Sequence, residues 1–427
     1  MKLIDNLEKV QDFLNGNGSE EFLGYYAAEH YTGPIMIIED DEVATLHLTN
    51  GHIDEITVGK PDADENTYIG VGGEGRIWDH LKDNYQRSIQ YINTDFADDE
   101  GWKVYGPKLL NRQFNTTLAH IARIYSYIRD NEEIYSDRPI REANQPVLDN
   151  HDYVRGFYIT VNGVKIYVET NDGPTDKGVI IALHTAGREN RQYHDLMNIF
   201  KDKYRIYAPD QPGHGKSMPL QGNTVVNDYN EYGNWIWDIT KALGVDRPIY
   251  VGCSMSGGIV YHMAIEHPDE VRAVVCMQGN DDTSVEDTSG MIPLLTHPAN
   301  NVGVTQREFS DSMVGRKTSQ DRFDFIRWGV ATETSVLKRG DFDICFFFDI
   351  KDRVHEVKCP VRIIEGTDDT IYTVEMAKGT MERLTGTDDK ELHVIDGYGH
   401  FIAVESPEKV APIIEDLIES LDDGYVG

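Results

Sequence analysis

The chain has 427 residues, a length for which we expect two to three domains. Its apolar fraction of 40% is ordinary for a folded protein with a sizeable core, and its 73 acidic against 40 basic residues give a formal net charge of −33. So acidic a chain repels phosphate groups, which argues against nucleic acids and anionic membrane surfaces as partners.

The cysteines Cys253, Cys276, Cys345 and Cys359 lie far apart in the sequence and lack the spacing of a zinc site. We therefore expect free thiols and no bound metal. The first residues lack the apolar core of a secretory signal, and no apolar stretch is long enough to span a bilayer. These features predict a cytoplasmic protein without a membrane span.

The first 130 residues predict a small α+β domain. Residues 43–48 alternate apolar and polar side chains, as a half-buried strand does, and Asn50-Gly51 is typical of a tight hairpin turn. We expect an antiparallel meander, then one more strand and helices. The predicted strands cover residues 34–38, 43–48, 53–58 and 67–71, and the predicted helices cover residues 1–30, a segment with Trp78 and Leu81, and residues 107–130.

The segment Gly70-Val71-Gly72-Gly73-Glu74-Gly75 matches the G-x-G-x-x-G pattern of dinucleotide-binding loops. Such a loop needs a parallel strand–helix–strand unit around it, whereas the strands expected here pair through hairpins. We therefore predict no nucleotide and no other organic cofactor.

The order of features in residues 20–130 resembles the sterol-carrier-protein-2-like (SCP2-like) domain. Those features are the hairpin at Asn50-Gly51, the segment Gly59-Lys60-Pro61-Asp62-Ala63-Asp64, a strand, and Trp78 on a helix. The resemblance implies a shell around an apolar tunnel that can hold lipids or acyl chains. The alternative is a packing or dimerisation domain with a filled core, through which the chain would form a homo-oligomer.

Residues 131–152 are polar, contain Pro139 and Pro146, and predict a linker to a second domain at residues 153–427. In that domain apolar runs alternate with helical patterns, which predicts a mostly parallel α/β sheet. The expected strands cover residues 157–161, 164–169, 179–183, 205–208, 249–252, 273–277, 361–364 and 392–395, with a helix at residues 225–243.

Residues 249–258 predict a strand, a sharp turn and a helix, with Ser254 at the apex of the turn. The sequence Gly252-Cys253-Ser254-Met255-Ser256 follows the G-x-S-x-G pattern except at Ser256, which is small enough for a crowded turn. Such a turn holds its serine in strained backbone geometry and exposes the hydroxyl group.

Four further motifs each follow an expected strand: Leu183-His184-Thr185-Ala186-Gly187, Asp210-Gln211-Pro212-Gly213-His214-Gly215-Lys216-Ser217, Gly366-Thr367-Asp368-Asp369 and Gly397-Tyr398-Gly399-His400-Phe401. With the serine turn, their order resembles the α/β-hydrolase superfamily over residues 153–427. The resemblance implies a Ser–His–Asp triad, in which an imidazole takes the serine proton and a carboxylate orients the imidazole.

In such a triad Ser254 would be the nucleophile and His400 the base. We predict Asp369 as the acid because it fits G-x-x-D after its strand, with Asp368 and Asp281 as alternatives.

By the same resemblance, the backbone N–H groups of Ala186 and Met255 would form the oxyanion hole. Thr185 stands where the family usually has a glycine. His184 and His214 are predicted to be structural. The residues after the loop, namely Arg188, Arg191 and Tyr193, either line the pocket or begin a solvated helix.

The residues between Gly279 and Lys358 lack the α/β pattern and lie where this superfamily carries a cap, so we predict a cap insertion at about residues 280–358. Their aromatic side chains favour a substrate with an apolar acyl or aryl group. The apolar residues expected to pack this lid are Met291, Ile292, Leu294, Leu295, His297, Phe309, Met313, Phe323, Phe325, Trp328 and Cys345-Phe346-Phe347-Phe348.

We predict a metal-independent serine hydrolase that cleaves carboxylic esters of small molecules through an acyl-enzyme. Two alternatives stay open. The same triad could hydrolyse the C–C bond of a diketone-like ring-cleavage product, since fold and triad do not separate the two reactions. A non-catalytic lipid-binding protein on a hydrolase scaffold is the other, although such proteins often lose a triad member and this sequence keeps all three.

Overall fold

The computed structural model describes residues 2–18, 31–75, 78, 102–107, 110–111, 114–134, 153–220, 222, 224–283, 310–329, 335–421 and 425. Contacts between Cα atoms divide the chain into two compact units, Met1–Arg141 with His297–Ser312 and Glu142–Thr296 with Met313–Gly427. Among the described residues, no helix combines the length and apolarity needed to cross a membrane. All four cysteines are free thiols, as expected.

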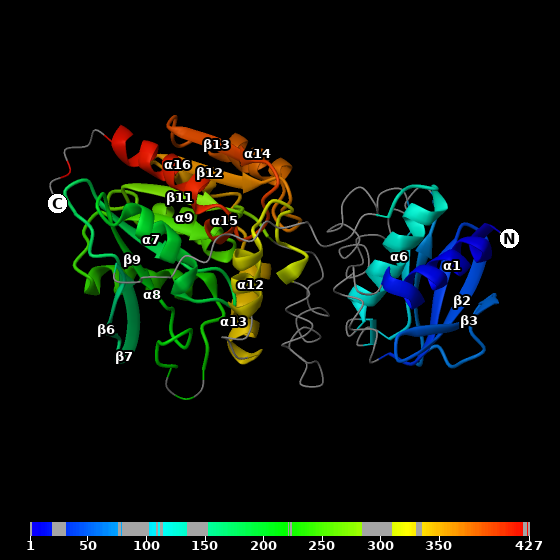
Figure 1. Ribbon diagram of the computed structural model, residues 1–427. Helices are drawn as coiled ribbons and strands as arrows, with labels where there is room; N and C mark the ends of the chain where they lie inside the picture. The colour runs from blue at the N-terminus through cyan, green and yellow to red at the C-terminus, as the bar shows by residue number, and fades with distance from the viewer. Residues whose placement is uncertain are drawn as a thin grey trace. The chain divides into compact units, whose positions relative to one another are not determined.

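The first unit is built on a five-stranded sheet with strand order β3-β2-β1-β4-β5 (Figure 1). Its strands are β1 Gly33–Glu39, β2 Glu42–Thr49, β3 His52–Val58, β4 Ile69–Gly73 and β5 Trp102–Tyr105. The helices α1 Lys2–Phe13 and α6 Asn115–Arg129 share one apolar core with the sheet, and a short π-helical segment, Leu14–Gly18, follows α1.

The expected antiparallel meander is correct for β1, β2 and β3 and wrong for β4, which pairs in parallel with β1. Hairpin turns determine the neighbours of the first three strands, whereas the local sequence does not determine which edge receives a later strand. The strand β5 was not predicted. Of the helix expected over residues 107–130, α6 covers Asn115–Arg129, and Leu110 and Asn111 are also helical. Residues 19–30 and Leu81 lie outside the described residues.

Gly70 and Gly72, the first two glycines of the G-x-G-x-x-G pattern, lie inside β4 and allow it to approach β1 closely. A Cβ atom would lie 2.7 Å from the carbonyl oxygen of Met36 if added to Gly70, and 2.1 Å from that of Ile38 if added to Gly72. Both distances are below any normal van der Waals contact, so only glycine fits. We attribute the pattern to sheet packing rather than to a phosphate-binding loop.

The second unit contains an eight-stranded sheet with strand order β13-β12-β11-β10-β8-β9-β7-β6 (Figure 1). The strands from β13 to β9 in this order pair in parallel, and β7 and β6 complete the sheet as an antiparallel hairpin, which confirms the expected α/β architecture. The strand bounds are β6 Arg155–Val161, β7 Val164–Thr170, β8 Val179–Leu183, β9 Arg205–Pro209, β10 Ile249–Cys253, β11 Ala273–Met277, β12 Val361–Gly366 and β13 Lys390–Ile395.

Helices cover both faces of this sheet because successive strand residues point to opposite sides. Ile181 and Leu183 of β8 share one core with α8 Tyr229–Ala242 and α9 Met255–Glu266. Ile180 and Ala182 share the opposite core with α7 His194–Phe200 and α16 Pro407–Ser420. The remaining described helices are the 3-10 segments Asn190–Tyr193 and Val354–Glu356, α12 Gln320–Gly329, α13 Ser335–Phe346, α14 Val374–Arg383 and α15 Ile402–Glu405.

Candidate active site

Ser254 lies at the sharp turn between β10 and α9, where the sequence predicted it. Its backbone angles are φ 59° and ψ −120°, a conformation that costs free energy for any residue with a Cβ atom. The strain is held because β10 and α9 are both buried and fixed by the core around them. The turn therefore presents the serine side chain at the carboxyl end of a central parallel strand.

The small residues around Ser254 are required by close backbone contacts. A Cβ atom on Gly252 would lie 2.1 Å from the carbonyl oxygen of Ser256, and one on Gly257 would lie 2.8 Å from that of Met277. Ser256, which departs from the usual glycine, uses its hydroxyl group to donate a 2.6 Å hydrogen bond to the carbonyl oxygen of His184. This bond ties the turn to the end of β8.

His400 joins Ser254 to Asp369. Its Nε2 atom lies 2.8 Å from Ser254 Oγ, and its Nδ1 atom lies 2.8 Å from Asp369 Oδ2. All three residues are buried. The other oxygen of Asp369 accepts hydrogen bonds from the backbone N–H groups of Ile371 and Tyr372, at 2.8 and 3.2 Å, so the carboxylate is held on both sides.

The two alternative acids point elsewhere. Asp368 accepts a 2.9 Å hydrogen bond from the backbone N–H of Arg316 and a second bond from the Arg316 guanidinium. Asp281 is fully buried in a bidentate pair with Arg383, with both oxygens 2.6 Å from guanidinium nitrogens. The structure thus brings Asp369, and neither alternative, against His400.

A buried carboxylate that the sequence analysis did not single out holds the loop that carries His400. Glu405 accepts hydrogen bonds from the N–H groups on both sides of His400, at 3.0 Å from Gly399 and 2.8 Å from Phe401. It also accepts from Gly315 N–H at 2.8 Å and from Thr318 Oγ1 at 2.5 Å. The sequence signal that could have identified it is a charged residue directly after the apolar run Phe401–Val404.

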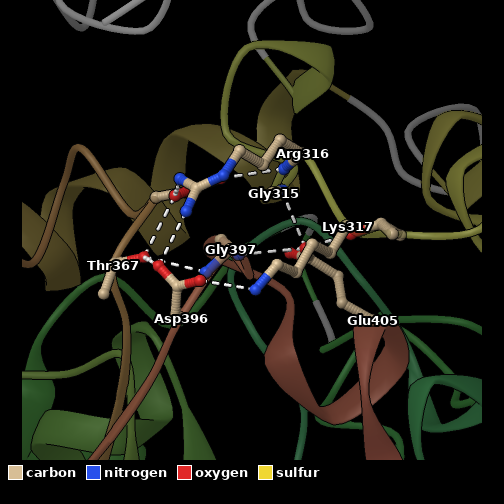
Figure 2. A network of polar contacts seen from close by, with 10 residues as sticks. Gly315, Arg316, Lys317, Thr367, Asp396, Gly397 and Glu405 are labelled. Carbon is tan, nitrogen blue, oxygen red and sulfur yellow. Dashed lines mark hydrogen bonds and ion pairs between the residues drawn. The ribbon is translucent and has the colours of Figure 1, made fainter. Parts of the chain in front are cut away.

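The segment that contains Gly315 also ties the loops after β12 and β13 together, as Figure 2 shows. Arg316, which pairs with Asp368, also contacts Asp396 at 2.7 Å, and Lys317 contacts the same carboxylate at 2.5 Å. The two loops bond each other directly, because Gly397 N–H donates to Thr367 Oγ1 at 2.8 Å. The loops that carry Asp369 and His400 are therefore fastened to one segment.

In the loop after β8, the backbone N–H groups on both sides of Ala186 are held by hydrogen bonds. The N–H of Thr185 donates to Gln192 Oε1 at 3.1 Å, and the N–H of Gly187 donates to Asp341 Oδ2 at 2.6 Å. Within the described ranges, neither Ala186 nor Met255 donates its N–H to another residue. These are the two N–H groups that the sequence analysis assigned to an oxyanion hole.

His184 and His214 are buried beside this loop and have structural partners. His184 Nε2 accepts a hydrogen bond from Gln211 N–H at 3.1 Å, and Nδ1 lies 3.0 Å from the carbonyl oxygen of Thr185. Burial lowers the pKa of His184 to about 4, so its ring is neutral at pH 7. His214 Nε2 lies 3.0 Å from Asp341 Oδ2.

Two of the three residues singled out after the loop, Arg188 and Tyr193, are buried rather than solvated. Arg188 is buried, donates to the carbonyl oxygen of Ile326 at 2.5 Å and lies over the ring of Phe401. Tyr193 is fully buried and donates to the carbonyl oxygen of Leu183 at 2.5 Å. Arg191 is partly exposed and bonds Glu189.

The expected lid is described only in part. Met291, Ile292, Leu294, Leu295, His297 and Phe309 lie outside the described residues. Met313 and Phe323 are buried, whereas Trp328 and Phe347 are exposed. Met313 has a second role, because its carbonyl oxygen accepts a 2.8 Å hydrogen bond from the backbone N–H of His400.

Two family models and solved structures of other proteins match this part of the chain. Residues 179–297 match a family model described as "alpha/beta hydrolase fold", and residues 247–408 match one described as "BAAT / Acyl-CoA thioester hydrolase C terminal". The esterase EaEST from Exiguobacterium antarcticum superposes with a TM-score of 0.54 at 19% identity, covering 62% of this chain and 100% of that one. The second unit has the α/β-hydrolase fold.

Two curated relatives of this chain are named as enzymes. The chain is 20% identical to 3-oxoadipate enol-lactonase 1 of Acinetobacter baylyi over 61% of its own length and 95% of the relative. It is 22% identical to a 2-hydroxy-6-oxononadienedioate/2-hydroxy-6-oxononatrienedioate hydrolase of Paraburkholderia phymatum over 61% of its own length and 94% of the relative. Together with the family models, these relatives support a hydrolase of the α/β-hydrolase superfamily. Both family models match within residues 179–408, so the SCP2-like resemblance of residues 20–130 stays a prediction.

Proposed function

We propose that the α/β-hydrolase unit hydrolyses carboxylic esters through a covalent acyl-enzyme formed on Ser254. The observation that carries this proposal is the continuous contact from Ser254 Oγ to His400 Nε2 and from His400 Nδ1 to Asp369 Oδ2, each at 2.8 Å. A serine hydroxyl at neutral pH is a poor nucleophile, and an adjacent, oriented imidazole is what activates it.

In the first half-reaction His400 takes the Ser254 proton as Oγ attacks the ester carbonyl carbon. The negative charge that develops on the carbonyl oxygen is stabilised by the N–H groups of Ala186 and Met255. The tetrahedral intermediate then collapses, and the alcohol leaves with the proton from His400. In the second half-reaction His400 takes a proton from water, the hydroxide attacks the acyl carbon, and Ser254 recovers its proton as the acid departs.

The substrate we propose is a small-molecule ester with an apolar acyl or aryl group. The acyl-CoA thioester hydrolase model matched by residues 247–408 and the names of the esterase and enol-lactonase relatives all describe acyl transfer to water. The described part of the predicted lid contains the aromatic side chains of Phe323, Phe325 and Phe348, which favours an apolar group.

Hydrolysis of a C–C bond is the second candidate, favoured by the 22% identical relative that acts on an oxo-dienedioate. The same Ser254, His400 and Asp369 would serve it, so only the substrate separates the two reactions.

The test compares wild type with Ser254→Ala on a short and a long p-nitrophenyl ester, with intact-mass analysis after treatment with a serine-directed phosphonate. We expect turnover by wild type, a loss of at least about 10³-fold in Ser254→Ala, and a mass adduct that only the variant lacks. Ser256→Ala is the matched control and should keep the adduct. Turnover that survives Ser254→Ala would overturn the proposal. An adduct on Ser254 without any ester turnover would favour C–C hydrolysis.

For the first unit we propose that it either delivers lipid-like substrates to the second unit or forms a homodimer. Deletion of residues 1–145 tests both roles. Light scattering gives the number of chains per particle for the deletion variant and for wild type. If that number is the same for both, and both turn over the long ester at the same rate, neither role is correct.

A further inference from the structure

We propose that Asp341, on helix α13, is a positioning residue for the oxyanion loop of this enzyme. The inference rests on the proposed function, since it concerns how Ala186 is placed to stabilise the developing charge. Asp341 lies in the chain between β11 and β12 and reaches the loop after β8, 154 positions away in sequence.

Asp341 accepts a hydrogen bond from the loop after β8. Gly187 N–H donates to Asp341 Oδ2 at 2.6 Å, a short bond of the kind that a charged acceptor makes. The loop therefore has a bond on each side of Ala186, to Gln192 through Thr185 and to Asp341 through Gly187. These two bonds fix the peptide planes that flank the Ala186 N–H.

Asp341 is itself held in place by burial and by His214. It is 2% exposed, and the same Oδ2 atom lies 3.0 Å from His214 Nε2, which is also buried. A carboxylate buried this deeply stays in one position only when it is paired and hydrogen-bonded, and here both partners come from loops that follow strands of the sheet. Asp341 thus links the loop after β8 to the loop after β9.

Helix α13 packs closely against the loop after β8. Gly187 has φ +62°, and a Cβ atom there would lie 3.3 Å from Lys338 Cγ, one turn before Asp341 on the same helix. The loop is therefore seated against α13, and the Asp341 bond sets its orientation. Removal of the acceptor would leave the Gly187 N–H buried and unpaired, and the flanking peptide would turn to find another partner.

Oxyanion donors act on the tetrahedral state far more than on bound substrate, so their displacement lowers kcat more than it raises KM. We expect Asp341→Ala to lower kcat by about 10- to 100-fold with KM changed less than about threefold. Affinity for a trifluoromethyl ketone, which forms a tetrahedral adduct on the serine, should fall by a similar factor. Asp341→Asn keeps an oxygen that can accept from Gly187 and should restore kcat to within about fivefold of wild type.

The experiment measures kcat and KM on the faster p-nitrophenyl ester, normalised to the fraction of Ser254 that a phosphonate titrates. Asp343→Ala is the control, since Asp343 lies on the same helix and its carboxylate faces Arg339 at 3.9 Å. If Asp341→Ala does not fold, Asp341→Leu fills nearly the same volume without an acceptor. A normal kcat in the Ala or Leu variant, or a kcat in Asp341→Asn as low as in Asp341→Ala, would overturn the inference. A wild type that neither turns over esters nor forms the adduct would instead overturn the proposed function, and the inference with it.

Discussion

Asp369 Oδ2 lies 2.8 Å from the Nδ1 atom of His400, whereas the adjacent Asp368 is directed to Arg316. Two neighbouring carboxylates of identical chemistry therefore have different partners. Near the end of a strand, successive side chains point in opposite directions, so only one of them can face the histidine.

The two aspartates give a matched pair of variants. We expect Asp369→Asn to lower kcat by about 10⁴-fold, because an amide cannot stabilise the imidazolium or hold the required tautomer. Asp368→Asn keeps an oxygen that can accept from the Arg316 backbone N–H and weakens the contact with the half-exposed guanidinium, so it should change kcat by less than about tenfold. Steady-state kinetics on one p-nitrophenyl ester checks both, and equal losses would contradict the assignment of Asp369.

Glu405→Gln should destabilise the second unit and slow catalysis. The carboxylate accepts four hydrogen bonds and donates none, whereas a glutamine amide would direct N–H groups at N–H donors. We expect a loss of about 2–4 kcal/mol in the free energy of unfolding and a lower kcat, because the His400 loop loses its anchor. Urea denaturation and kinetics measure the two effects.

The control for that variant is Glu408→Gln, three residues further along, where an exposed carboxylate pairs with Arg322. It should cost less than about 1 kcal/mol. A Glu405→Gln protein as stable and active as Glu408→Gln would show that the anchor is unimportant.

His184 should make the second unit less stable in mild acid. Burial lowers its pKa from 6.5 to about 4, so between these values the unfolded chain binds a proton that the folded protein does not. Its contribution to stability is complete above pH 6.5 and is lost as the pH falls toward 4, by about 3 kcal/mol in total. Urea denaturation at pH 7.0 and pH 4.5 measures how much the free energy of unfolding falls between these pH values. This fall should be smaller in His184→Gln than in wild type. Because other groups titrate in both proteins, equal differences would contradict the assignment to His184.

Gly72→Ala should destabilise the sheet of the first unit. A Cβ atom there would meet the Ile38 carbonyl oxygen at 2.1 Å, so β4 must move away from β1, at a cost of about 1–3 kcal/mol. Amide hydrogen exchange of peptides from β1 and β4 should accelerate in the variant. Gly16→Ala, where no heavy atom lies within 4 Å of the added Cβ, is the control, and similar exchange in both variants would contradict the packing explanation.

The sequence by itself was sufficient wherever a signal is local. The strands β8 and β11 match their predicted bounds, because a parallel strand buried on both faces is a continuous apolar run. Ser254 and His400 were proposed on the same kind of signal, since each stands in a short motif directly after a strand. In contrast, the parallel pairing of β4 with β1 and the strand β5 were not predicted, because their neighbours are distant in sequence.

Only the tertiary structure decided which of Asp368, Asp369 and Asp281 faces His400, because that choice depends on partners elsewhere in the chain. The same holds for Glu405 and Asp341, which bond residues up to 90 and 154 positions away. A buried carboxylate is stable only where several donors converge on it, and that convergence arises when the loops after separate strands come together. Local patterns therefore identify the groups proposed to react, whereas the groups that hold them in place become visible only in the folded chain.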